Sequence, residues 1–216
     1  MLTKYRDAST GLVLQMGQMA DFGQSERERA RQLLDLVFAG RMSDADWELG
    51  LCGLHVLAWT DDLLVGHASL IQGRLLYRGT ALRTGYVDAV AVHPEHQRRG
   101  IGGSMMDALE EVIVSAFELG ALGASDAGAE FYRKRSWREW RGPPSELTPL
   151  EGGRAPERGA AVFVFPGTRV LDADLGTKQQ GSLSLPASRP FEQERHDSVD
   201  PLRPPTRRGQ WPSGSA

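Results

Sequence analysis

The chain has 216 residues and a formal net charge of −3, with 40% hydrophobic and 25% charged residues, as in a globular protein that forms a core. This charge excludes a general attraction to nucleic acid or anionic membranes, and the lone cysteine, Cys52, excludes a disulfide framework. No apolar run approaches the roughly 20 residues of a membrane helix, and residues 1–20 lack the features of a signal peptide. We therefore expect a cytoplasmic protein whose partners include neither nucleic acid nor a membrane.

Two helices are predicted in the first quarter of the chain. Residues 25–28, Ser-Glu-Arg-Glu, have the pattern of a capping box, in which serine and glutamate satisfy free N–H groups at the helix start. Apolar residues then recur at helical spacing until Gly40. Residues 43–49 predict a second, shorter helix with Ser43 as its cap.

Strands and helices alternate in the rest of the predicted domain. In chain order they are strands at 55–59, 63–70, 75–78 and 82–92, a helix at 102–119, a strand at 121–124, a helix at 126–135, and strands near 137–140 and 161–165. A hairpin turn at residues 61–62 joins the first two strands. A meander followed by alternating strands and helices predicts the α/β class, with one central mixed sheet.

The last fifty residues differ in composition. Six of the 12 prolines follow Gly167, and the β-branched aliphatic residues are reduced there to Val170 and Val199. Such a segment buries too little apolar area to offset the cost of ordering its backbone, about 1–2 kcal/mol per residue. We expect one folded domain over residues 1–166 and a disordered tail over residues 167–216.

One segment carries the strongest chemical signal. An apolar strand over residues 87–92 runs into a turn rich in arginine and glycine, and this turn opens a long amphipathic helix. The free N–H groups at such a helix start, with Arg98 and Arg99 beside them, predict a pyrophosphate-binding loop. The turn lacks the lysine of a Walker loop and the third glycine of the dinucleotide fingerprint, because Met105 stands there.

The pattern Gln/Arg-x-x-Gly-x-Gly/Ala, with Val-x-Val upstream, resembles the acetyl-CoA signature of the GNAT N-acetyltransferase superfamily. Residues 129–137, Ala-Glu-Phe-Tyr-Arg-Lys-Arg-Ser-Trp, resemble its second motif, with Ser136 in place of glycine. The resemblance implies the GNAT acyl-CoA N-acyltransferase fold, acetyl-CoA as cosubstrate and no metal. The residues that it assigns to acetyl-CoA, here named the cofactor half, are Val90, Ala91, Val92, Gln97, Arg98, Arg99, Gly100, Ile101, Gly102 and Gly103.

The same resemblance implies three catalytic roles in direct acetyl transfer to a primary amine. Tyr132 would protonate the departing thiolate, while its neighbour Phe131 is interpreted as a core aromatic. Asp88 would accept the amine proton through a water, although a structural strand-end carboxylate also fits this position. The N–H of Val90 would stabilise the oxyanion where two strands splay apart.

A narrower resemblance covers residues 33–166. Residues 53–55 (Gly-Leu-His), 66–68 (Gly-His-Ala), 81–87 (Ala-Leu-Arg-x-Gly-Tyr-Val) and 119–122 (Leu-Gly-Ala-Leu) are similar to the aminoglycoside 2'-N-acetyltransferases. This resemblance implies antibiotic resistance by acetylation and a small, aminoglycoside-like amine as partner. It leaves the oligomeric state open, a homodimer included.

The chain departs from that family where the acceptor would bind. The positions concerned, here named the acceptor half, are Arg41, Asp88, Gly123, Glu157 and Arg158. The family has aspartate at Arg41, glutamate at Asp88, serine at Gly123 and acids at the last two positions. Two acids have therefore become bases, which reverses the charge that a polycationic acceptor would meet. The family's C-terminal ending is also absent.

Three functions stay open on the sequence alone. The first is an aminoglycoside 2'-N-acetyltransferase with a modified acceptor site. The second is a GNAT enzyme for another amine, an amino sugar or a protein N-terminus, with Arg41 and Arg158 favouring an acceptor that carries carboxylate or phosphate. The third is a catalytically weak acyl-CoA-binding protein.

The histidines of the predicted domain do not have the spacing of metal ligands. We therefore expect no metal site at His55, His67, His93 and His96.

Overall fold

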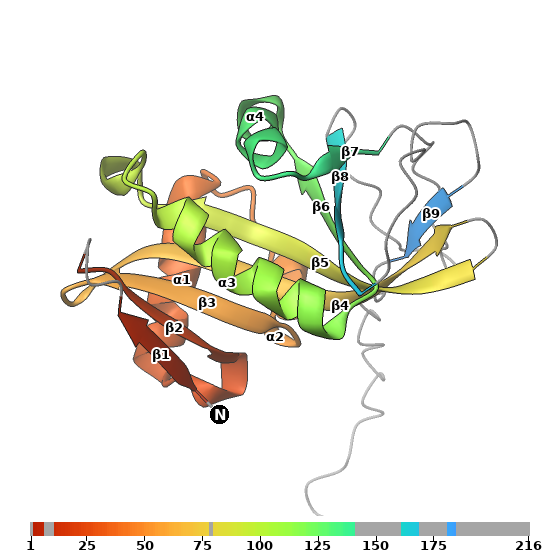
Figure 1. Cartoon of the computed structure of the whole chain (residues 1–216). Helices are drawn as coiled ribbons and strands as arrows, with labels where there is room; N and C mark the ends of the chain where they lie inside the picture. Colours follow the sequence, from red (N-terminus) through yellow and green to blue (C-terminus); the bar gives the residue numbers. More distant parts are fainter. Residues whose placement is uncertain (1, 7–10, 78–79, 141–160, 169–180, 185–216) are drawn as a thin grey trace, which may run out of the picture.

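A nine-stranded sheet forms the centre of the computed structural model, which describes residues 2–6, 11–77, 80–140, 161–168 and 181–184 (Figure 1). The strand order is β1-β2-β3-β4-β5-β6-β8-β7, with β9 paired to β4. The strands are β1 Thr3–Arg6, β2 Val13–Gln18, β3 Leu54–Thr60, β4 Leu63–Tyr77, β5 Thr80–Val92, β6 Leu119–Ala124, β7 Arg138–Glu139, β8 Ala161–Pro166 and β9 Gly181–Ser184. All described pairs are antiparallel except β5–β6. The prediction of a mixed α/β domain is confirmed.

Helices cover both faces of this sheet. On one face lie α3 (Ile101–Ala116) and α4 (Asp126–Lys134), whose buried residues join those of β3, β4 and β5 in the largest apolar cluster. On the other face α1 (Gln24–Val37) and α2 (Asp44–Leu51) pack on a separate cluster around Leu57 and Trp59 (Figure 1). Among the described helices, none is long and apolar enough to span a membrane.

The sheet opens at the end of β5. This strand runs parallel to β6 only over Thr84–Val87 and then continues alone on that edge to Val92 within the described pairing. On its other edge the register with β4 shifts, so that two residues of β5, Ala89 and Val90, face Ala68 alone. A bulge of this kind bends a strand and re-aims its backbone groups. The opening of the sheet and the bulge therefore lie in the same part of β5, just after Val87.

The starts of the helices agree only in part with the sequence patterns. α1 begins at Gln24, and its cap is Gly23, whose N–H donates to Oε2 of Glu26 at 2.6 Å. The predicted capping box at residues 25–28 is therefore wrong, because Glu26 is already the third residue of the helix. The cap at Ser43 is confirmed: its hydroxyl accepts the N–H of Asp46.

Two strand and helix boundaries also differ from prediction. The strand expected at 75–78 is not separate, because β4 runs without interruption from Leu63 to Tyr77. The helix expected at 102–119 ends at Ala116, since Leu119 already opens β6. The two N-terminal strands, β1 and β2, were not predicted.

Part of the expected tail is structured. β9 pairs with residues 74–77 of β4, on the edge that β3 leaves open beyond Leu70. The N–H of Thr168 also donates to the carbonyl of Phe117 at 2.8 Å. The prediction of disorder from Gly167 is therefore wrong for these residues. The rest of residues 169–216 lies outside the described part of the chain.

Candidate active site

The predicted anion-binding loop lies where β5 meets α3. After η2 (Pro94–His96), Gly100 takes a left-handed conformation, with φ +83, and caps the helix. The first helical bond runs from the N–H of Ser104 to the carbonyl of Gly100 at 3.0 Å, so the N–H groups of residues 101–103 have no acceptor inside the helix. These N–H groups lie at the N-terminus of α3, which is the positive end of the helix dipole. This arrangement fits a pyrophosphate.

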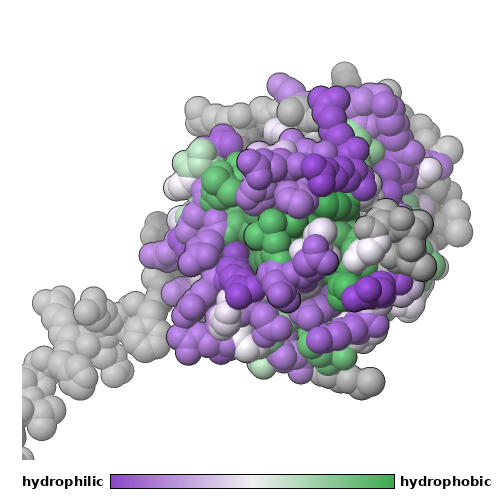
Figure 2. Space-filling view, turned by 90° about the vertical axis from the view of Figure 1, so that its left-hand side faces the viewer, coloured by the Kyte–Doolittle hydropathy of each residue, from purple (hydrophilic) through white to green (hydrophobic). Residues whose placement is uncertain are grey.

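Side chains of the loop tie it to β5 and leave its surface basic. Nε2 of Gln97 donates to the carbonyl of Val92 at 3.3 Å, and Nη2 of Arg99 donates to the carbonyl of Glu95 at 3.0 Å. Arg98 is exposed and has φ +60. The strand end, the loop and the helix start therefore form one unit, as the sequence predicted. Figure 2, which faces this end of the molecule, shows hydrophobic surface in the centre with hydrophilic residues around it.

Tyr132 comes to the same end of the sheet from α4. Its ring is 8% exposed and contacts Phe131, Trp137 and Phe163. Burial raises the pKa of Tyr132 to about 12; the charge of Arg135 opposes this rise and that of Asp88 adds to it. The hydroxyl is therefore protonated at neutral pH, as a proton donor must be. The charge of Asp88 thus acts on the Tyr132 hydroxyl, which links these two predicted catalytic residues electrostatically.

Phe131 connects the aromatic cluster to the anion-binding loop. It is half-buried, as predicted for a core aromatic, and packs against the main apolar cluster. A Cβ atom on Gly102 would lie 3.6 Å from Cζ of Phe131 and 3.8 Å from Cγ2 of Val92. The ring of Phe131 and the side chain of Val92 therefore border the space into which a side chain at position 102 would project.

Arg135 was missed by the sequence reasoning, which placed residues 133–135 in a solvated helix end. Its side chain is only 17% exposed and forms ion pairs with Asp107 and Glu110 of α3. Trp137 donates to the same Glu110 at 2.8 Å. The prediction holds for Arg133 and Lys134, whose side chains are 48% and 74% exposed, and is wrong for Arg135. Arg135 fixes α4 to α3, and no local sequence signal marks a partner 25 residues away.

A second missed feature is a pair of buried histidines. Nδ1 of His55 lies 3.0 Å from Nε2 of His67, and both residues are 1% exposed. Nε2 of His55 lies 2.9 Å from the carbonyl oxygen of Gly50, and Nδ1 of His67 lies 2.9 Å from that of Ala89. The contacts join α2 to the bulge of β5. His55 pairs with Ser69 and His67 with Leu57, so the two histidines are diagonal neighbours on one face of the hairpin. Because strand residues alternate between faces, the even spacing of the pair on a predicted hairpin could have suggested it.

The acceptor half is less completely described. Arg41 is exposed on the loop after α1, where its Nε donates to the carbonyl of Phe38 at 3.1 Å. Gly123 is exposed at the end of β6, and a Cβ atom there would lie 3.3 Å from the hydroxyl of Tyr86. Glu157 and Arg158 lie outside the described residues. Among the described acceptor residues, Asp88 is the one whose charge acts on the pKa of Tyr132.

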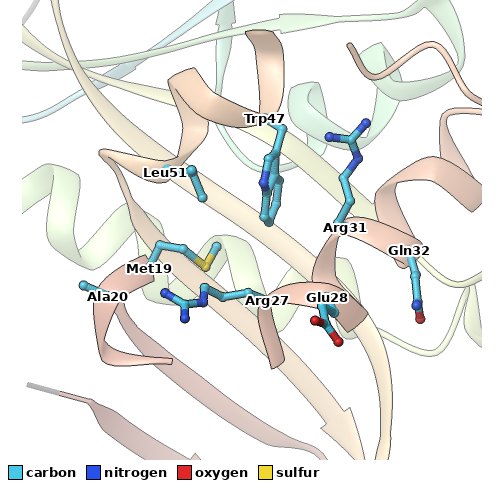
Figure 3. A pocket seen from close by; sticks show the side chains of 8 residues that line it. All are labelled: Met19, Ala20, Arg27, Glu28, Arg31, Gln32, Trp47 and Leu51. Atoms are coloured by element: carbon cyan, nitrogen blue, oxygen red, sulfur yellow. The ribbon is translucent and has the colours of Figure 1, made fainter. Parts of the chain in front are cut away.

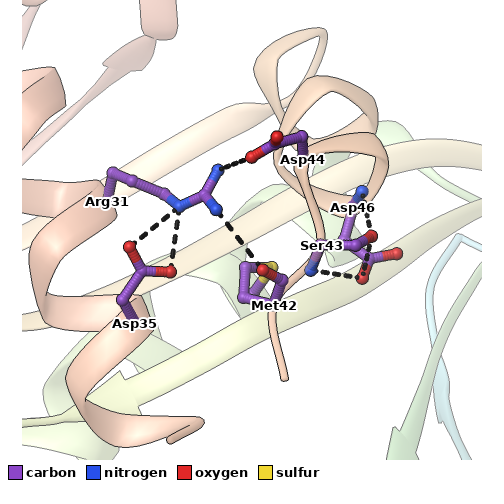
Figure 4. A network of polar contacts seen from close by, with 6 residues as sticks. All are labelled: Arg31, Asp35, Met42, Ser43, Asp44 and Asp46. Atoms are coloured by element: carbon purple, nitrogen blue, oxygen red, sulfur yellow. Dashed lines mark hydrogen bonds and ion pairs between the residues drawn. The ribbon is translucent and has the colours of Figure 1, made fainter. Parts of the chain in front are cut away.

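The loop that carries Arg41 is fixed by an ionic network (Figure 4). Arg31 of α1 donates through Nε to Asp35 at 3.0 Å and through Nη2 to the carbonyl of Met42 at 3.3 Å. Its Nη1 lies 3.0 Å from Oδ1 of Asp44, in the first turn of α2. The Arg31 side chain is 26% exposed, but those of Asp35 and Asp44 are 45% and 89% exposed, so water screens much of the attraction. The contacts connect α1 to the loop and to the start of α2.

A groove of about 700 Å³ lies between η1 (Met19–Asp21), α1 and α2 (Figure 3). It is lined by Met19, Ala20, Arg27, Glu28, Arg31, Gln32, Trp47 and Leu51. None of the residues of the cofactor half or the acceptor half lines it. We therefore place the chemistry at the opening of the sheet and not in this groove.

In the described part of the chain, no group of three His, Cys, Asp or Glu residues could hold a metal ion.

A family model described as "Acetyltransferase (GNAT) domain" matches residues 20–139, more than half of the chain. The chain belongs to the GNAT acetyltransferase family. The mixed sheet opens beside the end of β5, close to the N-terminus of α3. The predicted acetyl-CoA loop lies at this opening. In this GNAT N-acetyltransferase, the strongest sequence motif and the clearest anion-binding geometry lie in the same segment, residues 97–103.

Individual proteins similar to this chain include two acetyltransferases with named acceptors and one crystal structure of similar fold. The chain is 45% identical over 147 residues to an aminoglycoside 2'-N-acetyltransferase of Mycolicibacterium fortuitum, covering 68% of this chain and 75% of the relative. It is 37% identical over 75 residues to the glucosamine 6-phosphate N-acetyltransferase of Schizosaccharomyces pombe, covering 33% and 64%. The crystal structure of Escherichia coli ElaA matches 76% of this chain and 99% of its own, at 16% identity and a TM-score of 0.51. That last likeness concerns the fold alone.

Proposed function

We propose that this enzyme transfers the acetyl group of acetyl-CoA to a primary amine of an aminoglycoside. The observation that carries the proposal is the 45% identity to a relative of that name, over 147 residues and 68% of this chain. The narrower sequence resemblance, which covers residues 33–166, points the same way. The acceptor half departs from that family at Arg41 and Arg158, so we expect the activity to be weak.

The cofactor half fits acetyl-CoA. The N–H groups of residues 101–103 and the charges of Arg98 and Arg99 would hold its pyrophosphate. The space in front of Gly102 is bounded by Phe131 and Val92 at ordinary contact distance, so the backbone approaches the anion without obstruction. When bound, acetyl-CoA supplies an activated thioester carbonyl.

Three groups of this chain would then carry the transfer. The carboxylate of Asp88 accepts the proton that the attacking amine loses, through a water. The N–H of Val90, in the bulge where β5 has left β6, donates to the carbonyl oxygen as negative charge develops. The hydroxyl of Tyr132, protonated at neutral pH, gives its proton to the departing thiolate.

Steady-state release of free thiol from acetyl-CoA tests this function with a panel of aminoglycosides. The panel pairs acceptors that carry an amine at the 2' position with matched acceptors that carry a hydroxyl there. We expect turnover with the amines only, and mass spectrometry should locate the acetyl group on that nitrogen. Acetyl-CoA binding without turnover on any acceptor would instead identify an acyl-CoA-binding protein.

A phosphorylated amino sugar is the second candidate acceptor. The similarity to a glucosamine 6-phosphate N-acetyltransferase and the basic residues Arg41 and Arg158 favour it. Glucosamine 6-phosphate therefore belongs in the same assay, with unphosphorylated glucosamine as its control. A higher kcat/KM for the phosphate than for every aminoglycoside would replace the first assignment with the second.

A further inference from the structure

Two side chains of β4 hold the two carbonyl groups of the β5 bulge. The hydroxyl of Ser69 donates to the carbonyl of Asp88 at 3.0 Å. Nδ1 of His67 lies 2.9 Å from the carbonyl oxygen of Ala89, and because a carbonyl only accepts, the imidazole N–H is the donor. Ala89 has φ +50, a left-handed conformation that is unfavourable for a residue with a Cβ atom. The bulge therefore depends on contacts that hold it.

The bond to Ala89 also sets the direction of the next N–H. The carbonyl of Ala89 and the N–H of Val90 belong to one planar trans peptide, in which they point in opposite directions. A hydrogen bond that fixes the carbonyl therefore fixes the N–H. The bond from His67 also polarises this peptide, which makes its N–H a stronger donor.

His67 is itself held from behind. Its Nε2 faces Nδ1 of His55 at 3.0 Å, and Nε2 of His55 faces the carbonyl of Gly50 at the end of α2. Burial lowers the pKa of His55 to about 3, with the neighbouring His67 adding to the effect, and burial lowers the pKa of His67 to about 4. Both rings are therefore uncharged at neutral pH, and each carries one N–H. Since a carbonyl only accepts, these two N–H groups point to Ala89 and Gly50, and the contact between the two rings is a packing contact without an N–H. With two rings 1% exposed, neither can turn away to water.

We propose that His67, packed against His55, is a positioning residue that aims the N–H of Val90 at the thioester carbonyl oxygen. Ser69 assists by holding the preceding peptide. The proposal rests on the proposed function, which makes Val90 the oxyanion donor. Loss of the contact should lower kcat, because the donor matters most when charge has developed, and should leave the affinity for acetyl-CoA unchanged.

Two isosteric substitutions separate positioning from packing. In His67→Asn the side-chain amide nitrogen takes the place of Nδ1 and can still donate to the carbonyl of Ala89. In His67→Gln the amide lies where Nε2 was, and that donor is lost. We expect kcat to fall about 10- to 100-fold in H67Q, as for a displaced catalytic group, and to stay within about threefold of the parent in H67N.

The amide signal of Val90 in the ¹⁵N-labelled full chain gives a readout that is independent of turnover. It should shift in H67Q and return toward the parent position in H67N. If H67Q keeps both the parent kcat and the parent Val90 signal, the proposal is overturned. If the signal behaves as expected but no acceptor is acetylated even by the parent, the proposed function fails, and the orientation of Val90 by His67 stands.

Ser69→Ala keeps the experiment decisive if the histidine variants do not fold. This change removes one hydroxyl and should lower kcat several-fold, with a shift of the Ala89 and Val90 amide signals. An unchanged kcat together with unchanged signals in S69A would contradict the role of these side chains in holding the bulge. Calorimetric titration with CoA, expected to give the parent affinity, is the control for every variant.

Discussion

The cofactor half and the acceptor half of this enzyme are built in opposite ways. The cofactor half lies within one stretch of chain, residues 90–103, and presents backbone N–H groups at a helix start, through which we propose that it binds acetyl-CoA. The acceptor half takes single side chains from separate segments, among them the loop after α1, the bulge of β5 and the end of β6. Backbone groups tolerate many side-chain changes, whereas each acceptor contact depends on one residue. The contrast explains why the first half retains its family pattern and the second does not.

The largest expected effect tests the residue between the two halves. Tyr132→Phe keeps the ring contacts and removes the hydroxyl, so kcat should fall roughly 10²- to 10⁴-fold, the scale of a general acid's contribution. The affinity for acetyl-CoA, measured by calorimetry, should persist. Tyr5→Phe, at a residue that is 64% exposed on β1, is the matched control. Equal turnover in Y132F would make Tyr132 a packing residue.

The cofactor half is tested by Gly102→Asp. The added carboxylate would face the pyrophosphate and cancel favourable contacts worth about 1.5–3 kcal/mol each, so acetyl-CoA affinity should fall about 100-fold. The fold should persist, because a Cβ atom at this position meets its neighbours at 3.6 Å or more. Gly102→Ala adds the same Cβ without the charge and should bind nearly as the parent does. Unchanged affinity in G102D would remove this loop from the site.

The histidine pair beneath the bulge predicts a dependence of stability on pH. Because burial lowers the pKa of His55 and His67 from 6.5 to about 3 and about 4, the unfolded chain takes up protons that the folded chain does not. Their contribution to stability is thus complete above pH 6.5 and is lost as the pH falls toward 4. Between pH 7 and 5, urea unfolding should show a loss of about 2 kcal/mol for each histidine, about 4 kcal/mol for the pair.

His67→Asn should make that loss smaller, because one of the two titrations is gone. His96→Gln, which removes a histidine from η2, is the control and should keep the parent pH dependence. A parent chain whose unfolding free energy is constant between pH 7 and 5 would contradict a neutral, buried pair.

The smallest expected effect concerns the charge of the acceptor half. Arg41→Asp together with Arg158→Asp should lower the KM for aminoglycosides, by up to about fivefold for each exposed pair regained, since such pairs contribute about 0.2–1 kcal/mol. The gain should be larger at low salt, where the attraction is less screened. Lys4→Asp together with Arg6→Asp, at two exposed residues of β1, makes a matched charge change elsewhere. If the two double variants have the same KM, the charge reversal does not limit acceptor binding.

The sequence was sufficient for those parts of the molecule that depend on local patterns. The loop at residues 97–103 and the cap at Ser43 follow from spacing alone, because their contacts are made within a few residues. The burial of Arg135 depends on Glu110, 25 residues away, and the pairing of β9 with β4 joins segments more than a hundred residues apart. Such contacts depend on tertiary packing, which single-sequence periodicity does not contain. The same holds for the left-handed Ala89, since alanine gives no sign of a bulge.

The order of pairing in the sheet has a consequence for folding. β3, β4 and β5 are consecutive in the chain and pair through short hairpin connections, so their contacts have low sequence separation. The parallel pair β5–β6 forms only after α3 has returned the chain across the sheet, from Thr84 to Leu119. We therefore expect the meander that contains the bulge to form early and the docking of β6 to follow. The opening of the sheet would then form late in folding, when β6 pairs with β5 over Thr84–Val87 and, within the described residues, leaves the rest of β5 unpaired on that edge.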